Sequence, residues 1–380
     1  MIIGVPKETL NGETRVALIP QLVSALKRDN HDIVVQSGAG VEASHSDDQY
    51  TAAGARIAND ATSLYAEADI ILKVQPPTSD EAGMLKEGSS FIGYLAPASN
   101  RAIVQTFVQR KVTGFSMEYV PRITRAQTMD ALSSMATIAG YKAVLLGAER
   151  LDKMFPLLMT AAGTVAPATV LILGAGVAGL QAIATAKRLG ARVEAFDPRP
   201  AVKEQVKSLG ATFVDMEITE NVETAGGYAK EQSEEFLKRE QEVIDARLPK
   251  VDVVISTAQI FGKKAPVLIT ADMVKQMRHG SVIVDLAAEQ GGNCELTEPG
   301  KMVEKHGVRI IGAVNLAATV PVHASQMYAK NIVNLLQHMY PKGNPNLDFT
   351  DEIVKGCCIT RNGEIINESV RKALEQGGSN

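Results

Sequence analysis

The chain lacks the features that mark disulfide-stabilised, zinc-binding or nucleic-acid-binding proteins. It has only three cysteines in 380 residues, Cys294, Cys357 and Cys358. An odd number argues against a disulfide framework, and the adjacent pair does not have the spacing of a zinc site. A formal net charge of −4 gives no reason to expect nucleic acid as a partner. The composition therefore fits a globular protein of the reducing cytoplasm.

We expect neither a leader nor an uninterrupted membrane-spanning run in this sequence. Its first residues, MIIGVPKE, have neither the basic nor the apolar region of a signal peptide and are typical of a strand. The longest apolar stretch, about Ala168–Ala186, approaches the length of a membrane helix. Because a glycine turn divides it into a strand and a helix, we expect it to form protein core. We therefore expect this chain not to cross a membrane by itself.

Histidine is scarce and shows no catalytic or metal-binding pattern. The six histidines are His31, His45, His279, His306, His323 and His338. The first four lie beside turn residues or at the ends of predicted elements, where we expect mostly solvated side chains. No histidine has a ligand partner at helical spacing, and no Ser-His-Asp or Cys-His arrangement can be assembled. The sequence therefore predicts no metal site.

The most informative stretch runs from Thr169 to Arg199. An apolar run rich in branched residues predicts a buried parallel strand, and GAGVAG follows it in G-x-G-x-x-G spacing. Gly174 permits a tight turn, Gly176 lets a pyrophosphate approach the backbone, and Gly179 allows close packing of the helix. That helix, about Ala178–Leu189, offers free N–H groups and partial positive charge at its N-terminus. Dinucleotide binding is favoured over a merely structural turn.

An acidic residue completes this pattern. Asp197 ends the next predicted strand, Arg192–Phe196, at the expected distance of about 20 residues from the glycines. A carboxylate there is placed to accept hydrogen bonds from an adenosine ribose and to repel a 2′-phosphate. The sequence therefore favours NAD(H) over NADP(H), although the nearby Arg199 would soften that preference.

Strand-like and helical runs alternate along the chain, which predicts parallel sheets covered by helices. A length of 380 residues fits two domains. We therefore expect an α/β fold with two doubly wound, Rossmann-like parallel-sheet domains separated by a cleft, the second carrying the glycine motif. The expected strands are Ile2–Val5, Ile33–Val35, Ile70–Val74, Phe91–Leu95 and Thr113–Met117 in the first unit, and Val170–Leu173, Arg192–Phe196, Thr212–Val214, Asp252–Thr257, Ser281–Leu286 and Val308–Ile311 in the second.

Helices are expected between these strands, and a two-residue hairpin turn at Asn362–Gly363. An apolar helix without proline, about Ala131–Met154, is expected to link the two units. The other expected helices are Gln21–Arg28, Asp47–Ala53, Thr62–Glu67, Arg101–Arg110, Ser233–Arg247 and Ser325–Met339.

One connection, between Val214 and Asp252, is longer than a crossover requires. Its first half shows no apolar periodicity, and long loops in compact domains are usually lids or disordered segments. We favour a mobile loop with a hinge at Gly226–Gly227 and Tyr228 as its apolar tip. A solvated surface insertion is the alternative.

A polar cluster lies in Pro121–Ser134, where the first unit ends. Its members are Arg122, Arg125, Gln127, Asp130 and Ser133. They are candidates for a binding site, but Asp130 or Thr128 as a helix N-cap and the arginines in a solvated turn explain the pattern equally well.

Two further sets of residues are candidates for the edge of a site. Asp285–Asn293 follows a strand of the nucleotide domain at its carboxyl end, where doubly wound folds place ligands, and contains Glu289 and the flexible Gly291–Gly292. Lys7, Arg15 and Lys73 follow strands of the first unit, and surface charge is the alternative for all three.

On these residues the chain resembles the NAD(H)-binding domain I (α or α1 subunit) of proton-translocating nicotinamide nucleotide transhydrogenase. The resemblance covers nearly the whole chain, and its most specific segments are RITRAQ with the following Asp and Ser, and AGGYAKE. The broader superfamily includes alanine dehydrogenase, which shares the fold, Arg15 and Lys73.

The resemblance implies hydride transfer between NAD(H) on this chain and NADP(H) on a partner component, coupled to proton translocation by a membrane-spanning component. It also implies a homodimer held at the cytoplasmic face of the membrane through its partners. The first domain would be discontinuous, residues 1–132 plus 320–380, and the NAD(H)-binding domain would be residues 133–319.

Site residues are carried over in the same way. Around the nicotinamide and its ribose the resemblance places Arg122, Gln127, Asp130 and Ser133. It adds as cofactor-binding Arg125, Thr128, Met129, Gly174, Gly176, Val177, Gly179, Asp197, Pro198, Arg199, Gly227, Tyr228 and Gln259.

Two other functions remain open on sequence alone. An alanine dehydrogenase-like enzyme needs a proton acceptor near neutral pH, and Tyr94 stands where that family has histidine, with Glu289 in place of an aspartate. Hydride transfer between two nicotinamides needs no such group, so the missing histidine fits transhydrogenation. The third hypothesis is a non-catalytic NAD(H) sensor that signals by closure of the long loop.

Overall fold

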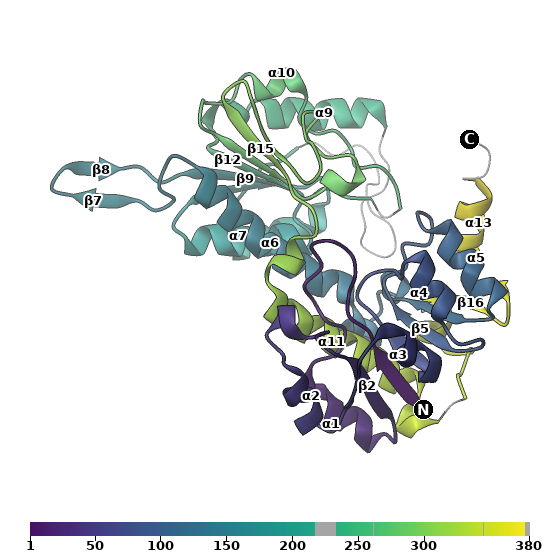
Figure 1. Cartoon of the computed structure of the whole chain (residues 1–380). Helices are drawn as coiled ribbons and strands as arrows, with labels where there is room; N and C mark the ends of the chain where they lie inside the picture. Colours follow the sequence, from purple (N-terminus) through teal and green to yellow (C-terminus); the bar gives the residue numbers. More distant parts are fainter. Residues whose placement is uncertain (217–232, 261, 345, 377–380) are drawn as a thin grey trace. The chain divides into compact units, whose positions relative to one another are not determined.

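The structure is a computed structural model that describes residues 1–216, 233–260, 262–344 and 346–376. The chain divides into two compact units (Figure 1). Unit 1 is Met1–Met135 with Ala317–Asn380, and unit 2 is Ala136–Leu316. The first unit is thus built from two separate stretches of the chain.

Unit 1 contains an eight-stranded sheet in the order β17-β16-β6-β5-β4-β1-β2-β3. The strands β1 to β6 are parallel, and only β16 and β17 run antiparallel to their neighbours. The order of the six parallel strands is that of a dinucleotide-binding fold, with its reversal between β1 and β4. The strands are β1 (Ile2–Val5), β2 (Asp32–Gln36), β3 (Arg56–Ala58), β4 (Ile70–Leu72), β5 (Ser90–Gly93), β6 (Thr113–Ser116), β16 (Cys358–Arg361) and β17 (Glu364–Ile365).

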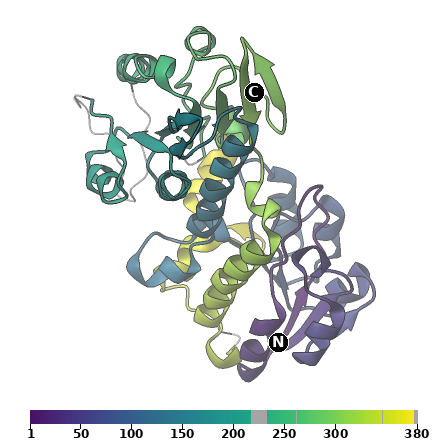
Figure 2. The ribbon, with the colours of Figure 1, turned by 90° about the vertical axis from the view of Figure 1, so that its left-hand side faces the viewer.

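The helices α2, α3, α4 and α12 of unit 1 begin at side-chain caps. Ser46 and Gln49 form a capping box at α2, and Thr78 and Glu81 form another at α4. Figure 2 shows α11 as a long green-yellow helix, and its buried side chains contribute to the core of this unit. The helices are α1 (Pro20–Arg28), α2 (Asp47–Ala52), α3 (Ala61–Glu67), α4 (Ser79–Met84), α5 (Arg101–Gln109), α11 (Pro321–Met339), α12 (Glu352–Cys357) and α13 (Glu368–Gln376).

Unit 2 contains a seven-stranded sheet in the order β11-β10-β9-β12-β13-β15-β14. Six strands are parallel in the same dinucleotide-fold order, with the reversal between β9 and β12, and β14 is an antiparallel edge strand. The strands are β9 (Thr169–Leu173), β10 (Arg192–Phe196), β11 (Thr212–Phe213), β12 (Val253–Ser256), β13 (Val282–Asp285), β14 (Met302–Lys305) and β15 (Val308–Gly312).

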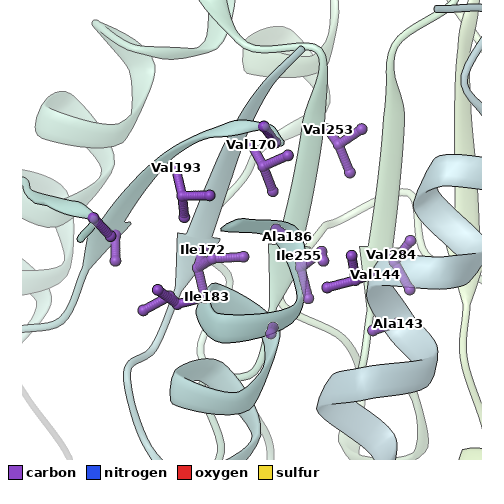
Figure 3. Close-up of a cluster of buried hydrophobic side chains, with 14 of the residues drawn as sticks. Ala143, Val144, Val170, Ile172, Ile183, Ala186, Val193, Val253, Ile255 and Val284 are labelled. Atoms are coloured by element: carbon purple, nitrogen blue, oxygen red, sulfur yellow. The ribbon is translucent and has the colours of Figure 1, made fainter. Parts of the chain in front are cut away.

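The helices of unit 2 cover both faces of this sheet. On one face, side chains of α6 (Ala131–Arg150) and α7 (Val177–Arg188) pack against alternate residues of β9, β10, β12 and β13 (Figure 3). On the other, α9 (Glu234–Asp245) and α10 (Ala271–Val274) pack against the remaining strand residues. A Cβ at Gly140 of α6 would collide with the Ala178 carbonyl oxygen, so glycine permits the close approach of α6 and α7. A short helix, α8 (Lys203–Ser208), follows β10.

Within the described ranges, α6 is the one helix long and apolar enough to span a membrane. Only 39% of its most apolar window is buried inside the structure. Helices in protein cores meet the same criteria of length and composition, so this finding does not assign α6 to a membrane.

The expected α/β fold with doubly wound parallel sheets is confirmed in both units. The expected turn at Asn362–Gly363 joins β16 and β17, with both residues at positive φ. The elements not expected from the sequence are β3, α4, α8, α10, α12, α13, the edge strand β14, and a hairpin of β7 (Leu158–Thr160) and β8 (Gly163–Val165) that projects from unit 2 (Figure 1).

Three expectations about local structure need correction. The helix expected over Ala131–Met154 ends at Arg150, because the chain turns into the segment leading to β7. His31 and His45 are buried, although solvated side chains were expected. The proposed mobile loop with Gly226, Gly227 and Tyr228 lies outside the described residues.

Candidate functional site

The glycine motif lies at the carboxyl end of β9, where the strand order of unit 2 reverses. Gly174 has φ +92°, and a Cβ there would lie 2.7 Å from Thr257 Oγ1. A Cβ at Gly179 would collide with the Gly174 carbonyl oxygen. Both glycines are therefore required by the turn, as the motif predicts.

Gly176 is different because, among the described residues, the space in front of it is open. It is the N-cap of α7, no described side chain caps this helix, and a Cβ would approach only Arg199 Nη2 of those residues, at 3.8 Å. The exposed Val177 follows it. An uncapped helix N-terminus with an open glycine in front is a cradle for an anion such as a pyrophosphate.

Asp197 closes the other side of this turn. The buried carboxylate accepts hydrogen bonds from the Ala175 N–H at 2.7 Å and from the Arg199 N–H, Nε and Nη2 at 2.8–2.9 Å. These bonds use the capacity of a carboxylate, about four acceptor positions. A ribose hydroxyl would therefore share an oxygen with Arg199 or displace it. Pro198, between them, is half-buried.

A hollow of about 370 Å³ lies in unit 1, at the polar cluster of Pro121–Ser134. Four of the candidate residues line it, together with neighbours of the same segment. Its walls are Pro121, Arg122, Ile123, Thr124, Ala126, Gln127, Asp130 and Ser133. The structure thus brings Arg122, Gln127, Asp130 and Ser133 together in one concave site.

Asp130 also has the structural role that the sequence left open. Its carboxylate accepts from the Ser133 N–H at 2.9 Å and from Ser133 Oγ at 2.6 Å, which caps the start of α6. Thr128 does not act as this cap, and its side chain is exposed. The two interpretations of Asp130 are compatible, because a capping carboxylate still lines the hollow.

Two other candidates of this segment point elsewhere. Met129 is 6% exposed, so its side chain belongs to the core rather than to the hollow. The half-exposed Arg125 side chain pairs with Asp351 at 2.9 Å and with Glu352 at 3.0 Å. Arg125 is therefore attached to α12 and does not line the hollow.

The reversal point of the unit 1 sheet is occupied by buried charged side chains. Lys73, after β4, pairs with Glu8 at 3.3 Å and with Glu81 at 3.0 Å. Surface charge is thus the wrong interpretation for Lys73, which is 0% exposed, and for Arg15, which is 4% exposed. Lys7 is exposed, as surface charge would be.

Arg15 is held by a carboxylate of its own segment. Its Nε and Nη2 donate to the two oxygens of Glu13 at 2.7 and 2.6 Å. Burial alone would raise the pKa of Glu13, but the hydrogen bonds and charge of Arg15 hold it at about 2. Burial raises the pKa of Glu8 despite the charge of Lys73. The sequence analysis missed Glu8, Glu13 and Glu81, although KETLNGETR shows two of them close to Arg15.

Tyr94 is half-buried in unit 1, with its hydroxyl group enclosed. Its ring packs against Tyr328 with centroids 5.4 Å apart, and its buried hydroxyl has no hydrogen-bond partner among the residues that the structure describes. Burial raises the pKa of Tyr94 above its ordinary value. This hydroxyl is thus an even poorer proton acceptor than an exposed tyrosine.

The cluster after β13 is organised by Asp285, which is inside the structure rather than at its edge. Its carboxylate accepts from the Asn293 and Cys294 N–H groups at 2.8 and 3.0 Å and from Thr297 Oγ1 at 2.7 Å. Glu289 is exposed on the loop so formed. The exposed Gln259, which follows β12, donates from Nε2 to the Leu286 carbonyl at 2.8 Å.

The candidates that remain are the loop residues and possible metal ligands. Gly227 and Tyr228 lie outside the described residues, so nothing places them. Within those described residues, no group of three or more His, Cys, Asp and Glu side chains could hold a metal ion.

Comparison with known proteins shows two family models on this chain. The model of the alanine dehydrogenase/PNT N-terminal domain matches residues 4–139, and that of the alanine dehydrogenase/PNT C-terminal domain matches residues 143–368.

Individual relatives match over nearly their whole length. The first part of NAD(P) transhydrogenase subunit alpha of Rhodospirillum rubrum is 50% identical over 97% of this chain and 99% of its own. Alanine dehydrogenase of Staphylococcus saprophyticus is 32% identical over 98% of this chain and 97% of its own. The crystal structure of transhydrogenase from Sinorhizobium meliloti is 41% identical, with a TM-score of 0.86 over 97% of this chain and 100% of that one.

Proposed function

The chain belongs to the alanine dehydrogenase/PNT family, and on that basis we propose that it is the NAD(H)-binding subunit of a proton-translocating transhydrogenase. In this proposal hydride passes between NAD(H) on this chain and NADP(H) on a partner component. The observation that carries it is the 50% identity to a transhydrogenase alpha-subunit chain over nearly all of both chains. The resemblance derived from the motifs alone is confirmed at the level of the family.

The geometry of unit 2 supports binding of a dinucleotide. The uncapped N-terminus of α7 and the open front of Gly176 fit a pyrophosphate, which would accept hydrogen bonds from the first backbone N–H groups of the helix. Asp197 and Arg199 would bind the adenosine ribose. The buried carboxylate disfavours a 2′-phosphate, which supports NAD(H) as the nucleotide.

In unit 1 the hollow at Gln127 supports a role at the nicotinamide end. A bound nicotinamide supplies or accepts the hydride itself. Arg122, Gln127, Asp130 and Ser133 would orient the ring and its ribose through amide, hydroxyl and charged groups. None of these residues needs to move a proton, because positioning of the two rings accounts for the reaction.

Tyr94 supports this function over that of an amino-acid dehydrogenase. Oxidative deamination needs a group that accepts a proton near neutral pH, and the buried Tyr94 hydroxyl, whose pKa is raised, does not supply one. Purified chain should therefore not reduce NAD⁺ when alanine is added. Sustained alanine-dependent reduction would favour the dehydrogenase instead.

The proposed partners are an NADP(H)-binding component, a membrane-spanning component and a second copy of this chain. The second copy is supported by the β7–β8 hairpin, since a two-stranded hairpin is marginally stable alone and this one exposes Leu157, Met159 and Val165. Sedimentation should show a dimer that M159S weakens. M302S, at another exposed strand methionine, should leave the dimer intact.

Reconstitution with the partner component tests the proposal directly. The chain mixed with a competent NADP(H)-binding component should transfer hydride from NADH to NADP⁺ or an analogue. Absence of transfer, with NADH binding intact, would contradict the proposed hydride transfer and favour the hypothesis of a non-catalytic NAD(H) sensor. Absence of NADH binding would contradict the proposal that this chain binds a nucleotide.

A Gln127 variant tests the nicotinamide end separately. Gln127→Asn shortens the side chain by one methylene, and a misplacement of about 1 Å can cost around 10²-fold in rate. Hydride transfer should fall steeply, while NADH affinity stays within about threefold because most binding comes from unit 2. Stopped-flow transfer and equilibrium NADH binding on one preparation decide this. Lost affinity with normal transfer per bound nucleotide would make Gln127 a binding residue.

A further inference from the structure

The segment that carries Gln127 is held by side chains far away in the sequence. Residues Thr124–Met129 form a short 3-10 helix whose buried residues are only Ala126 and Met129. Such a short segment has little stability of its own, because 3-10 geometry gives poorer hydrogen bonds than an α-helix. Its position must therefore come from contacts with the rest of unit 1.

Two asparagines of α11 converge on a single carbonyl of this segment. Asn331 Nδ2 donates to the Thr128 carbonyl oxygen at 2.8 Å, and Asn334 Nδ2 donates to the same oxygen at 3.1 Å. The two residues are three positions apart on α11 and so lie on one face of it. A carbonyl with two lone pairs accepts both bonds.

The position of Thr128 makes this contact relevant to the site. Gln127 precedes it and Asp130 lies two residues after it, and both line the hollow. Asp130 is in turn fixed to the start of α6 through Ser133. The Thr128 carbonyl is thus a hydrogen-bonded attachment directly next to Gln127, made by side chains that do not line the hollow.

Asn331 is an unusual residue for its surroundings. It is 6% exposed on a helix whose neighbouring buried residues include Tyr328, Ile332 and Leu335. Its buried Oδ1 has no hydrogen-bond partner within the described part of the chain. An amide with one unsatisfied atom is costly in a core, so stability alone would favour an apolar residue here.

The other attachment of this segment is weaker. Arg125 pairs with Asp351 and Glu352 of the α12 region, but its side chain is 52% exposed. Exposed ion pairs of this kind contribute little and are screened by salt. The two amide bonds are therefore the directional polar contacts that add to the packing of Ala126 and Met129 in positioning the segment.

We propose that Asn331 and Asn334 are positioning residues of the nicotinamide end, which act by holding the Thr128 carbonyl and thereby fix Gln127 and Asp130. Neither asparagine lines the hollow, so neither touches the nucleotide there. The inference rests on the proposed function, since it assigns these residues to hydride transfer between nicotinamides.

The test uses leucine, which has nearly the size of asparagine but no donor. N331L, N334L and the double variant are compared with Q337L. Gln337 is a matched control because it is an α11 amide that donates to Asp29 Oδ2 at 2.6 Å, outside the Gln127 segment. Each protein is measured for Tm, NADH affinity and hydride transfer at saturating NADH. Fluorescence lifetimes of bound NADH report on the ring itself.

The double variant should lose about thirtyfold in transfer rate, while its NADH affinity stays within about threefold. The lifetime of bound NADH should become shorter and more heterogeneous, because the ring is no longer held in one orientation. Q337L should lower Tm, because it removes the hydrogen bond to Asp29, and should leave transfer and lifetime unchanged.

Two outcomes would overturn the inference. One is a double variant with normal transfer and lifetime, and the other is a proportional loss of affinity, transfer and Tm in all variants. A wild-type chain that binds no NADH, or transfers no hydride with a competent partner component, would instead overturn the proposed function. The two failures are therefore distinguishable.

Discussion

Units 1 and 2 have the same order of parallel strands but opposite chemistry where that order reverses. In unit 2 the turn after β9 is made of glycines and opens onto the bare N-terminus of α7. In unit 1 the corresponding region beyond β1 and β4 holds Glu8, Lys73 and Glu81 in buried ion pairs. The fold offers a ligand site in both places, yet only unit 2 leaves its backbone donors available.

The difference lies in the length of the connection after the first strand. In unit 2, α7 begins four residues after β9 ends, so its N–H groups face the strand ends. In unit 1, α1 begins only at Pro20, well after β1 ends at Val5. The intervening segment brings Glu8, Glu13 and Arg15 instead. A shared fold therefore does not imply a shared site, and the loop after the strand decides the chemistry.

The largest effect should follow from removing the cation at the unit 1 reversal point. Lys73→Met leaves Glu8 and Glu81 buried without their cation and should lower the free energy of unfolding by about 3–5 kcal/mol. Denaturant unfolding measures this. Lys86→Met, which breaks an ion pair with Asp69 half-exposed at the surface, should cost less than about 1 kcal/mol. Equal losses of unfolding free energy in the two variants would mean that burial does not strengthen the ion pairs of Lys73.

The next effect concerns the glycine turn of unit 2. Gly179→Ala places a methyl group against the Gly174 carbonyl and should weaken NADH binding by about 100-fold, or 2.7 kcal/mol. Gly83→Ala is the control, because this α4 glycine has nothing within 4 Å and alanine should add about 0.5–1 kcal/mol of stability. Calorimetric titration and thermal melting check both. Unchanged NADH affinity in G179A would show that the turn can shift to accommodate the methyl group without loss of binding.

A smaller effect should come from the charge of Asp197. NADH should bind at least about tenfold more tightly than NADPH, which corresponds to 1.4 kcal/mol. Asp197→Asn keeps an acceptor for Ala175 but frees Arg199 from a carboxylate, so the preference should fall below about threefold. Asp215→Asn, at a mostly exposed carboxylate, is the control. Equal affinities in the unmodified chain would mean that Arg199 already overrides Asp197.

The last comparison concerns buried carboxyl groups, whose effect is a slope of stability with pH rather than a single loss. Unlike Glu8 and Glu13, Glu240 of α9 has no cation or hydrogen-bond partner among the described residues, and it lies in a buried stripe with Phe236 and Ile244. Burial, with a contribution from the charge of Asp197, raises its pKa to about 8.

The pH dependence follows from that shift. Between the ordinary pKa near 4.5 and about 8, the folded chain keeps the Glu240 proton that the unfolded chain has lost. Stability therefore falls as pH rises through this window, by about 1.4 kcal/mol per unit, and this loss ends above pH 8. Glu240→Gln should remove that slope from denaturant unfolding at pH 6–9. Glu242→Gln, on the exposed side of α9, should not; parallel curves for all three proteins would contradict the assignment.

The parallel strands were predictable because each is a short apolar run between turn residues. The strands β3 and β14 were not, since a three-residue edge strand and a polar one such as Met302–Lys305 carry no clear pattern. The β7–β8 hairpin was missed for a related reason, because its exposed apolar residues do not alternate with a buried face.

The candidate site was predictable where its residues lie close together in the sequence. The motif identifies Gly174, Gly176 and Gly179 because the turn needs them within a few residues. The attachment of Arg125 to Asp351 joins residues 226 positions apart, and no local pattern reports such a pairing. Sequence also could not show that Glu81 neutralises Lys73, since Glu81 reaches Lys73 only through the packing of α4.

The division of unit 1 into two stretches of the chain also sets an order of events during synthesis. Residues 136–316 emerge from the ribosome as one uninterrupted unit, with every strand of their sheet present. The first 135 residues must wait for α11, which fills their core, and for β16, which pairs with β6. Until then β6 lacks its pairing partner and α11 is missing from the core, although α3, α4 and α5 already pack on one face of the sheet. That interval is when the nascent chain depends most on chaperones.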